Sequence, residues 1–550
     1  MQTVLRTTRT PGLSAFILIT TLLLALTAFL QPAQALDDDA RALQVQLAAT
    51  VGAAGTDPAT ERLVAIRDFY GAREFSAVWV TKAKPNDKAQ AARDLLRTAD
   101  RDGLNPDDYL AAVTPLPDKF ADAGEAAQFE ISMSDAILHF LGDLRTGRVS
   151  PSRLDPDLFV ANAVIDRRAA LDAIATAADL RRVVTAYTPA NPVYRNLRDS
   201  LAAYRRVAAA GDWPTVPDGP KLTLGDSGPR VSALRARLAA TIDLLGSGIE
   251  SETFDDTLEQ ATIVFQKRHG LDPDGVVGRA TIAALKVSVD ARIEQIMLNM
   301  ERWRWMPDDL GERHVLVNIA AFSLQGIENG RIRSEMRVVV GKQYRRTPVF
   351  SDRISYLELN PFWHVPPKIA ANDVLPKIIA DPNYVASAGF SVLDGWGANA
   401  QTLDPAAINW SALGPGRFPY KLRQNPGPQN ALGSVKFMFP NKHDVYLHDS
   451  PARELFGRTL RTFSSGCIRV ERPLDLAAFV LNNQTGWEDR ADIQQAIAGK
   501  DTRIVRLATP VPVHLTYFTA WTSEDGTVNF RQDIYDRDSA LAKALSARKT

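Results

Sequence analysis

The chain has 550 residues, and its 64 basic side chains balance 64 acidic ones, so the formal net charge is zero. This balance gives no electrostatic argument for anionic lipid, and we expect no nucleic acid among the partners. A hydrophobic share of 45% and a charged share of 23% are ordinary for a globular protein. The length allows roughly two to four domains.

The first 35 residues have the layout of a secretory signal peptide. Arg6 and Arg9 precede an apolar run over residues 13–30, and Ala33 and Ala35 form a small-x-small cleavage site. The apolar run is also near the minimum length for spanning a bilayer, so an uncleaved inner-membrane anchor is the alternative. Both interpretations place the rest of the chain outside the cytoplasm.

Three helical segments are predicted next. Residues 36–212 carry apolar residues at spacings of three and four, which predicts a helical scaffold domain without recognisable catalytic residues. After a break rich in Pro and Gly, residues 221–287 read as two helices, a loop punctuated by glycines and a short third helix. An apolar stripe then predicts a connecting helix within residues 288–312.

From about residue 313 the pattern predicts strands. His314–Ile319 and Arg333–Val340 alternate as strands, with a hairpin turn signal at 328–330 between them. Residues 361–430 are rich in Pro, Gly and Asn and interrupt the strand pattern. A long insert of this kind is usually functional, so we expect a lid or a substrate-binding loop. Residues after 508 predict an added hairpin around Asp525-Gly526.

Cys467 is the only cysteine of the chain, so no intramolecular disulfide can form. In an exported protein a lone thiol is an oxidation liability. It is therefore either a buried, inert side chain or a reactive group kept for its chemistry.

The neighbours of Cys467 favour the reactive alternative. Tyr446 and His448 share one face of a predicted strand, and nineteen residues after His448 comes the turn Ser464-Ser465-Gly466-Cys467. Backbone N–H groups in such a turn converge as an acyl-transfer oxyanion requires. A nearby imidazole and the cation of Arg469 are expected to lower the pKa of the thiol, and Arg469 is also suited to anchoring a carboxylate. Cys467 would attack a carbonyl, and His448 would carry the proton to the leaving amine.

A metal site formed by His443, His448 and Cys467 is the competing interpretation. Positions five apart on a strand point to opposite faces, so the two histidines do not easily face one ion. We therefore expect no metal and no other cofactor.

These residues carry a resemblance to a known family. Residues 313–508 resemble the L,D-transpeptidase catalytic domain, whose signature is a histidine followed by Ser-x-Gly-Cys-hydrophobic-Arg or Asn. His448 and Ser464 to Arg469 fill this signature, and Ser465 stands where many members have a second histidine. Residues 221–287 resemble a small peptidoglycan-binding domain through Phe265-Gln266 and the Asp274–Gly278 loop. The layout resembles the large periplasmic members, which also carry serine at that position.

The resemblance implies a periplasmic enzyme that acts on peptidoglycan stem peptides. A tetrapeptide stem would lose its terminal D-Ala to form a thioester on Cys467, and the side-chain amine of a third residue on another stem would accept the acyl group. The imidazole would be oriented by the carbonyl of Asp449, and the N–H groups around Gly466, beside Ser465, would hold the oxyanion. Arg469, Tyr446 and Trp363 are the expected substrate-binding residues, and other cell-wall enzymes are potential partners.

Two further interpretations use the same residues. Hydrolysis of the acyl-enzyme would make the protein an L,D-carboxypeptidase, and loss of catalysis would leave a peptidoglycan-binding scaffold. The expected fold is multidomain α + β, with a mostly-β catalytic domain capped by a long insert. The expected domains are the signal peptide 1–35, the helical scaffold 36–212, the peptidoglycan-binding domain 221–287, the connecting helix 288–312, the catalytic domain 313–508 with its insert 361–430, and a C-terminal hairpin and tail 509–550.

Overall fold

The computed structural model describes residues 37–547, apart from 53–56, 161–162, 246–250 and the single positions 398, 415, 417, 483 and 488. The expected signal peptide lies outside this range. No helix within the described residues combines the length and the apolar composition needed to cross a bilayer. The chain divides into two compact units, of which the first comprises residues up to Ala92, Ala112–Ala136 and Arg167–Ala175.

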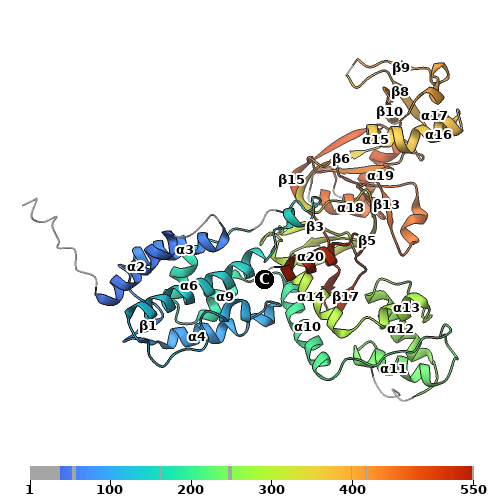
Figure 1. Cartoon of the computed structure of the whole chain (residues 1–550). Helices are drawn as coiled ribbons and strands as arrows, with labels where there is room; N and C mark the ends of the chain where they lie inside the picture. Colours follow the sequence, from blue (N-terminus) through green and yellow to red (C-terminus); the bar gives the residue numbers. More distant parts are fainter. Residues whose placement is uncertain are drawn as a thin grey trace, which may run out of the picture. The chain divides into compact units, whose positions relative to one another are not determined.

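The first unit is helical, and a buried polar cluster holds its core together. The hydroxyl of Tyr70 donates to Glu130 at 2.9 Å and lies 2.8 Å from the hydroxyl of Ser134. The indole N–H of Trp79 also donates to the Ser134 hydroxyl, so this buried hydroxyl has hydrogen bonds to both Trp79 and Tyr70. The elements are α2 (Asp38–Gly52), α3 (Pro58–Gly71), β1 (Val80–Thr81), β2 (Lys84–Pro85), α4 (Asp87–Leu96), α6 (Ala123–Thr146) and α8 (Arg167–Thr176). Figure 1 labels α2, α3, α4, α6 and β1.

Two long helices of the second unit share one apolar core. Tyr194 and Leu197 of α10 pack with Met300 and Trp303 of α14, and Phe518 completes this cluster. The predicted connecting helix and its apolar stripe are therefore present as core packing. The helices outside the sheet are η1 (Ala99–Asp102), α5 (Asp107–Leu110), α7 (Pro151–Leu154), α9 (Leu180–Tyr187), α10 (Pro192–Ala209), α14 (Val289–Arg304) and α20 (Arg537–Ala547).

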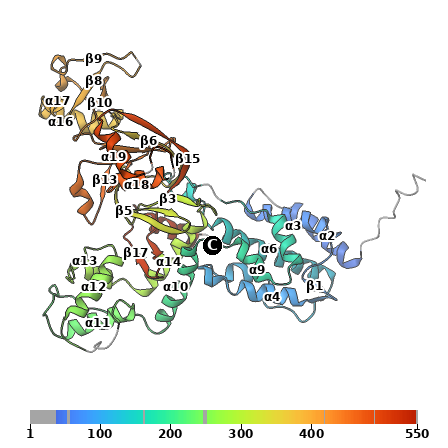
Figure 2. The ribbon, with the colours of Figure 1, turned by 180° about the vertical axis from the view of Figure 1, so that it is seen from behind.

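The small helical module consists of α11 (Pro229–Ala240), α12 (Asp256–Arg268) and α13 (Arg279–Leu285), which group together in Figure 2. Gln266 is buried, and its amide donates to the Val276 carbonyl and accepts from the N–H of Gly275 at 2.9 Å each. The Gln266 side chain thus fixes the glycine-containing loop to helix α12. These signature residues have a structural task in this module.

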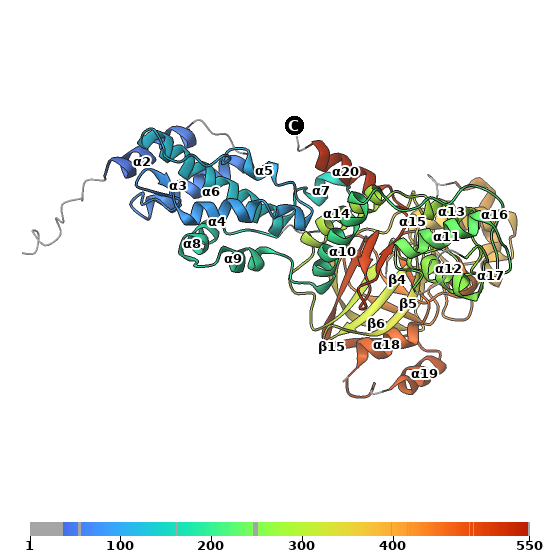
Figure 3. The ribbon, with the colours of Figure 1, turned by 90° about the horizontal axis from the view of Figure 1, so that it is seen from below.

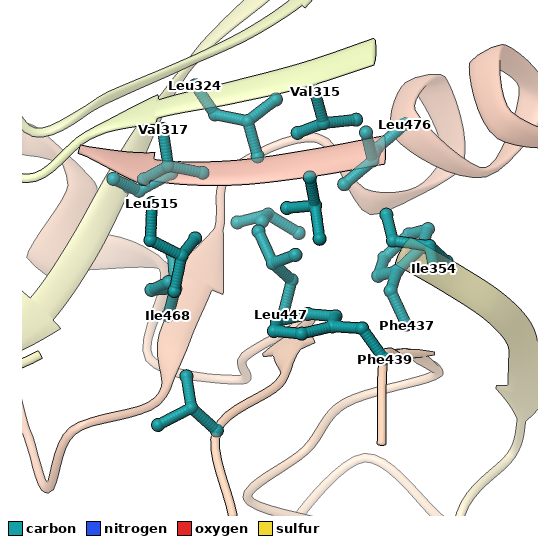
Figure 4. Close-up of a cluster of buried hydrophobic side chains, with 14 of the residues drawn as sticks. Val315, Val317, Leu324, Ile354, Phe437, Phe439, Leu447, Ile468, Leu476 and Leu515 are labelled. Carbon is teal, nitrogen blue, oxygen red and sulfur yellow. The ribbon is translucent and has the colours of Figure 1, made fainter. Parts of the chain in front are cut away.

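A nine-stranded sheet forms the body of the catalytic region. Its order is β13-β5-β14-β12-β11-β6-β15-β3-β4, and a further pairing of β5 with β4 closes it on itself. Figure 4 shows the buried core that these strands share with helix α18. The strands are β3 (Arg313–Asn318), β4 (Ser323–Glu328), β5 (Arg331–Gly341), β6 (Phe350–Leu359), β11 (Val435–Met438), β12 (Leu447–His448), β13 (Thr462–Ser464), β14 (Ile468–Val470) and β15 (Arg503–Thr516).

Helical segments complete this region. η5 (Arg453–Gly457) lies between β12 and β13, and α18 (Pro473–Leu481) and α19 (Arg490–Ala498) follow β14. Figure 3 shows α18 and α19 beside each other next to the strands. Leu476, Ala477 and Leu481 of α18 are buried in the common core. Pro473 occupies the first turn of α18, where its missing N–H leaves no helical hydrogen bond unmade.

The insert expected to act as a lid or substrate-binding loop is a folded subdomain with its own core. Its four-stranded sheet has the order β7-β10-β8-β9, and Val365, Ile378, Val392 and Leu422 are fully buried in its core. The elements are β7 (Trp363–His364), α15 (Pro367–Ile369), the π-helical η2 (Ala370–Val374), α16 (Leu375–Ala380), α17 (Tyr384–Ser387), β8 (Phe390–Leu393), β9 (Thr402–Leu403), η3 (Pro405–Ala407), η4 (Trp410–Ala412) and β10 (Lys421–Gln424).

Two strand predictions need correction. Strand β4 was not predicted, and it is β4 that the turn at Asn329-Gly330 joins to β5. The expected boundary at residue 508 cuts through β15, which continues to Thr516 and pairs with β3 and β6. The C-terminal hairpin is shorter than expected, with β16 (Ala520–Thr522) paired to β17 (Val528–Phe530). The α + β class, with helical modules and a mostly-β catalytic domain, is confirmed.

Candidate active site

The register of three strands gathers the predicted residues on one face of the sheet. Leu447 lies opposite Ile468, and both are fully buried in the core. Their neighbours point to the other face because side chains alternate along a strand. Tyr446 therefore lies beside Cys467, and His448 lies opposite Arg469. His448 and Cys467 are diagonal neighbours on this face.

Hydrogen bonds hold the turn before Cys467 in a fixed conformation. Gly466 has φ +120°, a region that favours glycine. Its carbonyl accepts from the hydroxyl of buried Thr347 at 2.8 Å. Its N–H donates to the Ser464 hydroxyl at 3.1 Å, and that hydroxyl donates to the carbonyl of Cys467. The Gly466 N–H is therefore already engaged within the turn.

The ring of His448 is held by the backbone. Its Nδ1 lies 2.6 Å from the Asp449 carbonyl, the arrangement that the family resemblance implies. Nδ1 donates this bond, so Nε2 is left as the basic atom. The Asp449 carboxylate in turn accepts from the N–H and the hydroxyl of Ser434, at 2.9 Å each. These bonds fix the end of strand β12 where the imidazole is attached.

Burial keeps both reacting groups neutral in the resting protein. Desolvation, with help from the nearby cation of Arg469, lowers the pKa of His448 to about 3. Desolvation also raises the pKa of Cys467, and the charges of Lys436 and Arg469 offset this only in part. The expectation of a lowered thiol pKa is therefore wrong, because the desolvation of the half-buried thiol outweighs the nearby positive charge.

Tyr446 lies beside the thiol, which donates a hydrogen bond to the Asp444 carbonyl at 3.7 Å. Burial raises the pKa of Tyr446 well above its ordinary value, and the neighbouring Cys467 raises it further. Trp363 lies on β7 of the insert, where it pairs with Gln424 of β10. The ring of Tyr446 also lies edge-on to His448, with 5.6 Å between ring centres. Of the three predicted substrate-binding residues, Tyr446 thus lies beside the thiol, and Trp363 acts on Tyr446 from the insert.

Arg469 and Ser465 have different surroundings. The described residues offer Arg469 no ion pair within 4 Å, and its Nε is buried without a hydrogen-bond partner. The Ser465 hydroxyl accepts from Arg345 at 2.9 Å, and Arg345 forms an ion pair with Asp373 of the insert. Ser465 therefore serves a contact between the catalytic turn and the insert.

His443 packs against aromatic rings. Its ring lies tilted against that of Phe159, with 3.8 Å between centres, and 4.9 Å from the ring of Phe350. The described part of the chain has no group of three His, Cys, Asp or Glu side chains arranged to hold an ion.

Three site residues were missed by the sequence analysis. Thr347 supports the Gly466 carbonyl from a distant loop, and Arg345 reaches Ser465 from the same loop. Neither carried a local signal. Lys436, in contrast, alternates with the apolar Val435 and Phe437, which are both buried in the core. That alternation predicts a side chain on the face of His448.

The comparisons with known proteins cover most of the chain. Family models match at residues 64–201 ("Scaffold domain"), 227–285 ("Putative peptidoglycan binding domain") and 312–513 ("L,D-transpeptidase catalytic domain"). A Haemophilus influenzae protein named "Putative L,D-transpeptidase" is 38% identical over 268 residues, which is 48% of this chain and 53% of that protein. The chain thus spans about half the length of this relative.

Two more distant likenesses are limited in extent. The Mycobacterium tuberculosis N-acetylmuramoyl-L-alanine amidase CwlM is 40% identical over 81 residues, covering 13% of this chain and 20% of the amidase. The crystal structure of an L,D-transpeptidase from Xylanimonas cellulosilytica aligns with 55% of this chain and 99% of that one, at 18% identity and a TM-score of 0.18. The chain therefore contains, in this order, a scaffold domain, a peptidoglycan-binding domain and the catalytic domain of the L,D-transpeptidases.

Proposed function

We propose that the protein is an exported peptidoglycan L,D-transpeptidase that joins the third residues of two stem peptides through a thioester on Cys467. One observation carries the proposal: Cys467, His448, Tyr446 and Arg469 lie on one sheet face, with His448 held by the Asp449 carbonyl. The peptidoglycan-binding domain supports the assignment of the cell wall as substrate.

The neutral resting pair sets the order of proton transfers. As the Cys467 sulfur attacks the carbonyl of the third residue, its proton passes to Nε2 of His448. The C–N bond to D-Ala then breaks, and the imidazolium returns the proton to the leaving amine. The acceptor amine attacks the thioester, gives its proton to His448, and the proton returns to sulfur as the thiol leaves.

The Cys467 N–H is the backbone donor that we assign to the developing oxyanion. In this proposal Tyr446, beside the thiol, and Trp363 of the insert contact the stem peptide, and Arg469 binds one of its carboxylates. The insert, linked to the catalytic turn through Ser465 and Arg345, is the part suited to selecting the acceptor.

The test mixes the purified chain with disaccharide-tetrapeptide fragments of peptidoglycan, follows the products by mass spectrometry, and uses Cys467→Ala as the control. Loss of D-Ala together with dimers joined through their third residues, absent in the control, is the expected result. Loss of D-Ala without dimers would instead identify an L,D-carboxypeptidase. No turnover, with retained binding to peptidoglycan in both proteins, would favour the non-catalytic scaffold.

A further inference from the structure

A row of charged side chains crosses four adjacent strands through His448. Lys436 of β11 lies opposite Glu358 of β6 on one side and opposite His448 of β12 on the other. Arg469 of β14 lies on the far side of His448. All four side chains belong to the face opposite the buried core, so two cations flank the histidine.

The positive charge in this row is only partly neutralised. Lys436 Nζ lies 3.5 Å from the Glu358 carboxylate, and it also lies 4.4 Å from the ring centre of Tyr446. Glu454 is the acidic group that acts on Arg469, but it forms no ion pair with it among the described residues. Two cations that are half-buried and only partly paired are costly unless an anion completes them.

The insert adds positive charge on the same side. Arg423 of β10 lies opposite His364 of β7, and its Nε is buried without a hydrogen-bond partner. Lys421, Arg423 and Lys436 all act on His364, and Glu358 is the acidic side chain that opposes them. The surroundings of Lys436 therefore hold an excess of cations over carboxylates.

We propose that Lys436 and Arg469 bind a carboxylate of the donor stem peptide on either side of His448, and that this binding prepares His448 to accept the thiol proton. The inference rests on the proposed function and adds to it a second anion contact, Lys436, and a coupling between substrate binding and proton transfer. Arg469 stands two residues from Cys467, or about 7 Å along a strand. The carboxylate therefore lies within about one residue of the bond that is cleaved.

The physical reason is electrostatic. His448 faces Arg469, Lys436, Tyr446 and the Asp449 carbonyl, with the carboxylates of Glu358 and Glu454 beyond the two cations. Burial is the main cause of its low pKa, and the charges of Arg469 and Lys436 lower the pKa further. A bound carboxylate cancels these charges and raises the pKa of His448 when the substrate is in place. Neutral ligands would leave the imidazole a poor base.

The experiment uses the full chain and synthetic tetrapeptide stems in which each carboxylate is amidated in turn. Acylation of Cys467 is followed by intact-protein mass and D-Ala release in wild type, Lys436→Met and Lys436→Arg. In the wild type, we expect amidation of the engaged carboxylate to slow acylation about 10-fold or more. In Lys436→Met, the same amidation should slow acylation by less than about twofold. Lys436→Arg should restore the sensitivity because it restores the charge.

Lys377→Met is the matched control, since Lys377 also lies over a tyrosine ring, that of Tyr384, at 5.6 Å. It should respond to amidation as the wild type does. Alkylation of Cys467 by iodoacetamide and the melting temperature show whether the Lys436→Met site is intact.

Two outcomes contradict different statements. If each amidated stem slows wild type and Lys436→Met equally, the carboxylate site is wrong while the transpeptidase proposal stands. If no stem peptide acylates the wild type at all, the proposed function fails and this inference fails with it.

Discussion

Two places in the same sheet hold buried histidines, and only one of them has the surroundings of an active site. His448 on β12 is held by the Asp449 carbonyl. His514 on β15 lies 2.9 Å from the Leu310 carbonyl and 2.8 Å from the Ser351 hydroxyl, with His314 at 5.7 Å between ring centres. Burial lowers the pKa of both, to about 3 for His448 and to about 4 for His514.

A low pKa and a carbonyl-held ring are therefore common to a reactive and an unreactive histidine. The difference lies in the neighbours. His514 uses both ring nitrogens in hydrogen bonds, so it has no basic atom to offer. His448 adjoins a thiol, a tyrosine and two cations on the sheet face opposite the core. The arrangement around the ring, more than its pKa, indicates function.

The largest expected effect separates the two histidines directly. His448→Gln should lower the rate of Cys467 acylation by about 10²–10⁴, because it removes the proton acceptor. His514→Gln should change the rate by less than about threefold, since His514 touches no reacting atom. Cys467→Ala gives the background. Rates are measured as D-Ala release from a tetrapeptide stem, and an equal loss in both variants would refute the comparison.

The thiol itself provides the next test. Because Cys467 is the only cysteine, the pH dependence of iodoacetamide alkylation reports its ionisation alone. Burial raises the thiol pKa, so alkylation should increase only above the ordinary cysteine pKa of about 8.5. His448→Gln should leave this profile almost unchanged, because the imidazole is neutral in the resting protein. A reactive plateau near pH 6–7 would show a thiolate–imidazolium pair instead.

A smaller effect is expected from the support behind His448. Gly433 has φ +61°, and a Cβ there would collide with the Asp449 side chain. Gly433→Ala should displace the Asp449 carbonyl and lower acylation about 10-fold. Gly330→Ala is the matched control, since Gly330 has φ +72° but open space around its Cβ position. Both variants lose about 1 kcal/mol of stability from the strained backbone, and only Gly433→Ala should lose activity.

The sequence predicted what depends on local pattern and missed what depends on long-range packing. Period-two alternation placed Tyr446 and His448 on one face, and the Ser464–Cys467 turn was predicted from its glycine. Thr347 reaches Gly466 across 119 residues and carries no local signal. The strands of the insert were not predicted, because they are only two to four residues long. The direction of the Cys467 pKa shift depends on how far the thiol is buried. The alternation of polar and apolar residues along a strand does not predict that degree of burial.

The smallest effect concerns stability and uses the unreactive histidine. The pKa of His514 is about 4 in the folded protein, against about 6.5 in an unfolded chain. Below pH 6.5 the unfolded chain therefore binds the proton first, and acid favours unfolding. This group should cost about 2 kcal/mol of stability between pH 7.5 and pH 5, and the loss should level off below pH 4.

Urea unfolding at pH 7.5 and pH 5 measures this loss for wild type and His514→Gln. The variant should lose less stability on acidification, because glutamine does not titrate. His448→Gln should flatten the curve in the same direction and abolish acylation as well. If His514→Gln leaves the pH dependence of stability unchanged, His514 is not buried as a neutral group. The two histidines would then share a hydrogen bond to a carbonyl but not a lowered pKa.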